Sequence, residues 1–280
     1  MQGRRRGTRV ERRTKAIVLG LLLGGVVVLI VSVAIRPAIA DEDEGRPEHG
    51  PQAQAFVHGA PEVPTEAWTL AAGGRIYDTW WEALDRKEPE GTHPSYPKAG
   101  KQAGSATWRC KECHGWDYRG DQGNYRTGSH FTGIAGIDVA IGKPTEEIAA
   151  ILRDATHGYT PAMINDDELA RVTAFVNRGQ VDVAKYVDLQ TRKVVAGNAD
   201  RGREIYQTTC AACHGFDGRL LNWGNKVEPA YVGTEAKSAP DEVLHKILNS
   251  HPGVQMINLR AFPLDDAVDV LAYTATLPEK

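Results

Sequence analysis

The residues of this sequence whose types and spacing could do chemistry are cysteines followed by histidines. The chain of 280 residues contains four cysteines, and all of them lie in two C-x-x-C-H pentapeptides. These pentapeptides supply two matching sets of side chains, Cys110, Cys113 and His114 in one and Cys210, Cys213 and His214 in the other. Thiols and imidazoles bind metal ions, and thiols also form disulfides and thioethers. The repeated spacing therefore indicates a single chemistry that is used twice.

Four uses of such pairs compete. A zinc site with four thiolates leaves both histidines unexplained. A redox disulfide of the thioredoxin type needs a βαβ context that the sequence lacks. Structural disulfides suit an exported protein but give no reason for pairs two residues apart. Covalent haem attachment accounts for all five positions, because two thiols add to the vinyl groups of one porphyrin and the histidine ligates its iron. We therefore predict two covalently attached haem c groups.

The sixth ligand of each iron is predicted to be a methionine. Apart from Met1, the sequence has two methionines, Met163 and Met256, and each begins a Met-Ile-Asn tripeptide at a matching place in the chain. An electron-carrying haem usually has both axial positions of its iron filled, and the second ligand is often a methionine, which raises the reduction potential. Two histidines, His157 and His251, lie five or six residues before these methionines and compete with them. Ligation by two histidines would lower the potential of that haem.

The other histidines have less clear roles in the sequence. Two of them lie in the first half near its motif and are further candidates, namely His93 and His130. Three are expected at solvated or surface positions, namely His49, His58 and His245.

The two halves repeat one another beyond the pentapeptides and read as helical. Gly-Gly-Arg-Ile-Tyr at 73–77 matches Gly-Arg-Glu-Ile-Tyr at 202–206, and apolar residues at spacings of three and four recur in both halves. No run alternates for long as a strand would. We predict an all-α protein with a spacer at 41–64, a first domain at 65–180 with an insertion at 85–108, a linker at 181–196, and a second domain at 197–280.

Both halves resemble class I cytochrome c domains, and the chain is similar to membrane-anchored dihaem c-type cytochromes. The most specific segments are "GREIYQTTCAACHGFDG" and the methionine that precedes a closing helix with an aromatic residue. The resemblance implies two tandem domains in which the first and last helices cross. It places Gly202 and Tyr206 near Tyr273 in the second half, with Gly73, Tyr77 and Phe175 as their counterparts in the first.

Two departures from the family pattern concern the first half. Its insertion separates the first helix from Cys110, so that helix is not continuous with the motif. The family also places a proline whose carbonyl accepts a hydrogen bond from the iron-bound histidine. Pro229 occupies that place in the second half, whereas Ser129 stands there in the first. We therefore expect His214 to be oriented more firmly than His114.

The N-terminal segment, residues 1–40, is predicted to carry the chain into the membrane. Seven basic residues precede an uncharged apolar run at 16–35, which as a helix would span roughly 30 Å, the thickness of the hydrocarbon core. Basic residues stay on the cytoplasmic side, so both haem domains are expected in the periplasm. The alternative is a cleaved signal that ends at "AIA" in 38–40. Export holds under both interpretations.

Electron transfer is the function that we expect from these features. Residues 41–280 hold 25 basic and 35 acidic side chains, a formal net charge of −10, which disfavours nucleic acid and favours redox partners with basic docking faces. We expect the protein to pass single electrons between such partners at the cytoplasmic membrane, alone or within an oxidoreductase complex, and to have no catalytic residue of its own. The alternative is a dihaem oxidoreductase, a peroxidase or a thiosulfate dehydrogenase-like enzyme, with catalysis at one haem.

Overall fold

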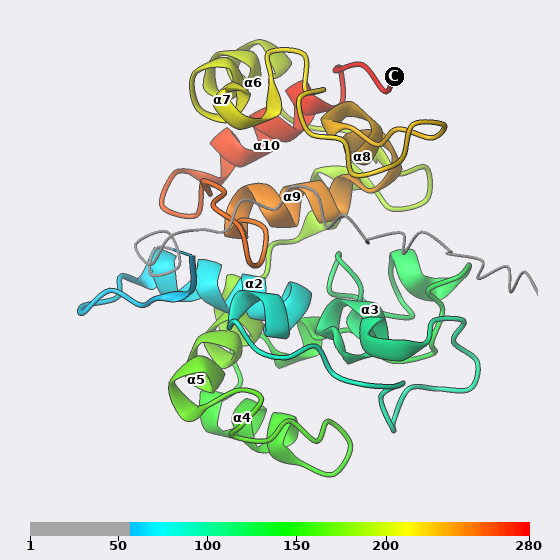
Figure 1. The fold of residues 1–280 in the computed structure, drawn as a ribbon, viewed down its shortest axis with the longest axis vertical. Coiled ribbons are helices and arrows are strands. Elements are labelled where there is room, and N and C mark those ends of the chain that lie inside the picture. Colours follow the sequence, from blue (N-terminus) through cyan, green and yellow to red (C-terminus); the bar gives the residue numbers. More distant parts are fainter. Residues whose placement is uncertain (1–56) are drawn as a thin grey trace, which may run out of the picture. The chain divides into compact units, whose positions relative to one another are not determined.

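The part of the chain that the structure describes is built mostly of helices. The structure is a computed structural model, and it describes residues 57–280 (Figure 1). The predicted membrane segment at 16–35 and most of the spacer lie outside these residues. Within 57–280 no helix is long and apolar enough to cross a membrane. The helical character agrees with the prediction, and the division into two domains stays a prediction.

The first half places one long helix against a pair of shorter ones. Its elements are α2 (Glu66–Ala83), η1 (Gly104–Trp108), α3 (Cys110–His114), η2 (Asn124–Arg126), η3 (Asp138–Ala140), α4 (Thr145–Arg153), α5 (Asp166–Ala174) and the π-helical turn η4 (Phe175–Gly179). The side chain of Thr65 caps the start of α2. A capping box of Asn165 and Glu168 starts α5, in which each residue's side chain binds the other's backbone N–H. As predicted, α2 ends well before the motif helix α3 begins.

The second half begins with a small hairpin that the sequence did not indicate. Its elements are η5 (Val183–Lys185), β1 (Val187–Asp188), β2 (Lys193–Val194), α6 (Ala199–Ile205), η6 (Tyr206–Cys210), α7 (Ala211–His214), α8 (Val232–Ser238), α9 (Pro240–Asn249) and α10 (Leu264–Thr274). The two strands pair antiparallel, with Val187 opposite Val194. Val183 and Val187 are buried. The predicted linker is therefore packed structure rather than a free tether.

In each half the first and last helices cross closely, as the resemblance implied. A Cβ at Gly202 of α6 would overlap the carbonyl oxygen of Asp269 in α10, so only glycine permits this approach (Figure 1). The rings of Tyr206 and Tyr273 lie 5.3 Å apart beside this crossing. The first half repeats the arrangement, because Gly73 of α2 packs onto the backbone of α5 and its helix places Tyr77 against the first residue of η4.

A buried polar contact joins the two halves. His245 of α9 is 1 % exposed and lies between residues of the first half. Its Nε2 donates to the Gly74 carbonyl at 3.0 Å, and its Nδ1 accepts from the Tyr118 hydroxyl at 2.8 Å. Its ring centre lies 5.0 Å from that of Trp116. This burial corrects the expectation that His245 is a surface residue.

Candidate haem sites

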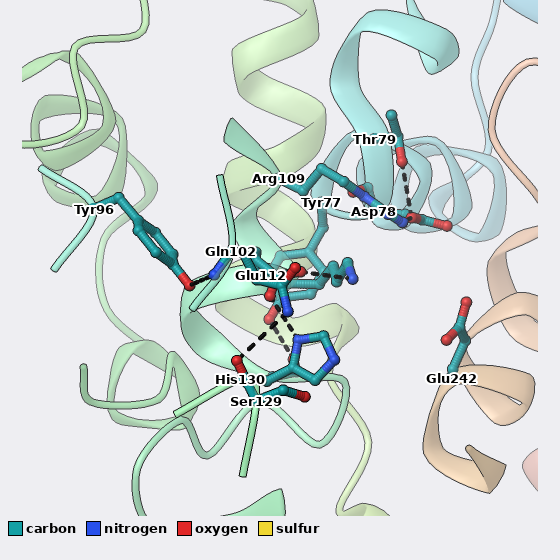
Figure 2. Close-up of polar contacts among 12 residues, drawn as sticks. Tyr77, Asp78, Thr79, Tyr96, Gln102, Arg109, Glu112, Ser129, His130 and Glu242 are labelled. Carbon is teal, nitrogen blue, oxygen red and sulfur yellow. Dashed lines mark hydrogen bonds and ion pairs between the residues drawn. The ribbon is translucent and has the colours of Figure 1, made fainter. Parts of the chain in front are cut away.

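The first C-x-x-C-H motif forms the short helix α3, which α2 holds at both ends. The two cysteines are one helical turn apart, so their side chains leave the helix on the same side. Arg109, directly before the helix, donates from Nε to the Asp78 carbonyl at 2.9 Å and pairs with the Asp78 carboxylate (Figure 2). Gly115 ends the helix with a φ of +82° and accepts from the Tyr77 hydroxyl at 2.6 Å.

His114 is held by a backbone carbonyl. Its Nδ1 lies 2.8 Å from the carbonyl oxygen of Ala135, so this nitrogen carries the proton and donates it. Burial lowers the pKa of His114, which favours the neutral ring. Nε2 is then an unprotonated nitrogen that can bind a metal. The expectation that Ser129 leaves this histidine less firmly oriented is wrong, because Ala135 supplies the acceptor.

The second motif continues directly from the helix before it. The segments α6, η6 and α7 follow one another without a break from 199 to 214. His214 has a buried Nδ1 with no hydrogen-bond partner among the described residues. The expected acceptor, the Pro229 carbonyl, therefore does not hydrogen-bond to it, although the neighbouring Ala230 carbonyl accepts from the backbone N–H of Trp223 at 2.9 Å. A buried polar nitrogen without a partner requires a ligand or a water to satisfy it.

Large apolar side chains are exposed in the half that carries the second motif. Trp223 is 49 % exposed, and its ring centre lies 5.7 Å from that of His214. Six further exposed apolar residues belong to this half, Phe216, Leu220, Leu221, Val227, Ile257 and Phe262. The exposed indole of Trp223 beside His214 is available to contact a bound group. Two thiols, one imidazole and an apolar surrounding fit a covalently attached porphyrin.

The four thiols do not form a shared metal site or a disulfide. All four cysteines are unpaired. Among the described residues, no group of three or more His, Cys, Asp or Glu side chains is placed to hold a metal ion. Burial raises the pKa of Cys110 to about 11 and that of Cys113 to about 12, so both are neutral thiols near pH 7. This arrangement disfavours the four-thiolate zinc site that the sequence left open.

The two candidate methionines occupy matching loops. Met163 lies between α4 and α5, is half-buried, and packs against the apolar core. Met256 lies in the loop between α9 and α10 and is also half-buried. Their roles as iron ligands stay predictions.

The remaining histidines separate into different environments. His157 lies beside His114, with ring centres 6.4 Å apart. His251 donates from Nδ1 to the Pro252 carbonyl at 2.8 Å, and burial lowers its pKa to about 4. His130 pairs at 2.6 Å with a buried carboxylate of α3, that of Glu112, as Figure 2 shows.

One comparison with known proteins concerns the second half. Residues 197–273 match the family model of cytochrome C oxidase, cbb3-type, subunit III. No curated protein matches the chain. The match supports a c-type cytochrome domain in this half, and such a domain implies covalently bound haem c. It ends at Tyr273, the aromatic residue of the closing helix α10.

Proposed function

We propose that the protein is a dihaem c-type cytochrome that transfers single electrons between redox partners on the outer face of the cytoplasmic membrane. The observation that carries the proposal is the repetition of one arrangement. In each half a C-x-x-C-H turn ends at a glycine with positive φ beside a crossing of the first and last helices. The match to a c-type cytochrome domain at 197–273 supports the same assignment for the second half.

Different side chains would attach each porphyrin and bind its iron. Four thiols would form the thioethers, and His114 and His214 would bind the irons from one side. A haem c held there would supply a one-electron couple between ferric and ferrous iron. The buried tyrosines at the helix crossings would exclude water from each site, and exposed apolar residues such as Phe216 would lie against a porphyrin or at the surface where a partner docks.

The haem number is tested with paired variants of the two motifs. The full-length chain, produced in a host that attaches haem c, should have the mass of the polypeptide plus two haems. It should also remain coloured by a haem stain after denaturing electrophoresis. Replacing both cysteines of either motif by serine should remove one haem and leave the other. A wild-type mass with one haem or none would refute the proposal.

The membrane location rests on residues 16–35 of the sequence. We expect the protein to fractionate with the cytoplasmic membrane and its haem domains to be accessible from the periplasm. Mature protein whose N-terminus is Asp41 would show cleavage instead of a retained anchor and would leave export intact.

The formal charge of −10 on residues 41–280 favours partners with basic docking faces. The family matched at 197–273 takes its name from a subunit of an oxidase, so a terminal oxidase complex is one candidate acceptor. Electron exchange with a basic redox protein should slow as ionic strength rises through about 0.1 M, where the Debye length is about 10 Å. A rate that is independent of salt would contradict electrostatic docking.

A further inference from the structure

The distance between His114 and His157 matches two ligands of one metal ion. Their ring centres are 6.4 Å apart, and the ring planes differ by 17°. A metal–imidazole bond is about 2.0 Å long, and the centre of a five-membered ring lies about 1.2 Å beyond its nitrogen. Two imidazoles on opposite sides of one metal ion therefore have ring centres about 6.3 Å apart. The separation of the two ring centres is therefore the one expected for two imidazoles that bind the same iron.

In both rings the same nitrogen, Nδ1, already donates a hydrogen bond. Nδ1 of His114 donates to the Ala135 carbonyl at 2.8 Å, and Nδ1 of His157 donates to the Asp154 carboxylate at 3.3 Å. No residue among 57–280 hydrogen-bonds to Nε2 of either ring. Histidines that ligate metals usually donate their other N–H to a carbonyl or a carboxylate, which fixes the tautomer and the ring orientation. Both Nε2 atoms therefore keep a free lone pair.

The loop that carries His157 is braced from two sides. Just after α4, the carboxylate of Asp154 accepts from the backbone N–H of His157 at 2.9 Å. The carbonyl of His157 accepts from Nε2 of His93, which belongs to the insertion at 85–108, at 3.0 Å. The ring of His93 in turn lies 4.3 Å from that of Trp108, just ahead of the first motif. The insertion thus connects the first motif to the loop opposite it.

The second half lacks this arrangement. When the repeat is aligned on Ile-Leu at 151–152 and 247–248, Ser250 stands in place of Asp154 and Gly253 in place of His157. The nearest histidine, His251, donates its Nδ1 to the Pro252 carbonyl. Among the described residues its ring contacts no other ring, and the ring contact of His214 is with a tryptophan. The two candidate sites therefore differ in the histidines that lie beside the motif histidine.

We propose that the haem tethered at Cys110 and Cys113 has His114 and His157 as its axial ligands, and that Met163 does not bind iron. The second haem keeps Met256 as its distal ligand. This inference rests on the proposed function, since it assumes a haem at each motif. Because methionine raises the potential of a haem relative to histidine, the first haem is the lower-potential member of the pair. Electrons would then reside preferentially on the second haem.

The test uses the full-length holoprotein, whose haem content is first established by mass. Ferric haem with a methionine ligand has a weak sulfur-to-iron charge-transfer band in the far red, and haem with two histidines lacks it. We expect the wild type to show the band of one haem per chain. Met163→Leu should leave the band unchanged, and the matched variant Met256→Leu should remove it. A band that loses half its amplitude in Met163→Leu would overturn the inference.

A second variant tests His157 directly. His157→Leu should open one iron, so the reduced variant should bind one carbon monoxide per chain, whereas the matched variant His251→Leu should bind none. A His157→Leu protein with two haems that binds no carbon monoxide would also overturn the inference. If this variant does not fold, the spectrum of Met163→Leu alone tests whether Met163 binds the first iron. A wild-type mass below two haems is a separate outcome, because it refutes the proposed function itself.

Discussion

Replacing Asp78 by asparagine should destabilise the protein by about 3 kcal/mol. The carboxylate is fully buried, and it pairs with Arg109 ahead of the first motif and with Lys246 of α9, the latter at 2.8 Å. Burial alone would raise the pKa of Asp78, but the charges of Lys246 and Arg109 lower it well below its ordinary value. Asp78 is therefore ionised near pH 7, and Asp78→Asn removes a charge that two cations require.

The expected loss of stability in Asp78→Asn depends on how far the two cations are exposed to water. Removing one partner of a buried ion pair costs about 3–5 kcal/mol, because the other charge remains buried without compensation. The side chains of Arg109 and Lys246 are 24 % and 17 % exposed, so water relieves part of this cost. We therefore expect the lower end of the range.

The assay is guanidinium unfolding of the full-length protein in mild detergent at pH 7, followed by the helical circular dichroism signal. The matched control is Asp166→Asn, which removes a pair with Arg153 at 3.1 Å whose carboxylate is 90 % exposed. Exposed pairs contribute about 1 kcal/mol or less. If Asp78→Asn costs no more than this control, the buried ion pairs do not stabilise the fold as argued.

Three further predictions follow from the structure. Burial lowers the pKa of His245 to about 3, below its ordinary value of 6.5, so the unfolded chain binds more protons. Stability should then fall as pH drops below about 6.5, by up to about 1.4 kcal/mol per pH unit, and His245→Gln should flatten this slope between pH 6.5 and 5; an unchanged slope would contradict a neutral buried ring. Gly202→Ala should lower the unfolding midpoint by forcing α6 away from α10, whereas Ala199→Gly at the half-buried first residue of α6 should lower it less. Finally, reduced wild-type protein should not bind carbon monoxide if, as proposed, each iron has two protein ligands; rapid stoichiometric binding would favour the oxidoreductase alternative.

The sequence predicted the features that depend on local spacing. The two motifs form helical turns, and the glycines and tyrosines at the helix crossings lie where the resemblance to class I cytochrome c domains placed them. The sequence also predicted the break between α2 and the first motif, since an insertion of that length is visible directly.

The features that could not be predicted from the sequence depend on contacts between segments far apart in the chain. His245 occurs in a helix of ordinary amphipathic pattern, and nothing near it indicates that Tyr118 and Gly74 satisfy both ring nitrogens. The acceptor for His114 was missed because the family pattern directed attention to Ser129, whereas a loop six residues later supplies the carbonyl. The hairpin β1–β2 was missed because each strand has only two residues.

The contact of His245 with the first half also bears on modularity. Two independent domains could be separated and expressed alone. Here each copy completes the other's interior: the first supplies a hydroxyl and a carbonyl to the histidine of the second, and the second supplies an ammonium group to Asp78 of the first. The two halves therefore depend on each other, and an isolated half would leave polar groups without the partners that they have in the whole chain.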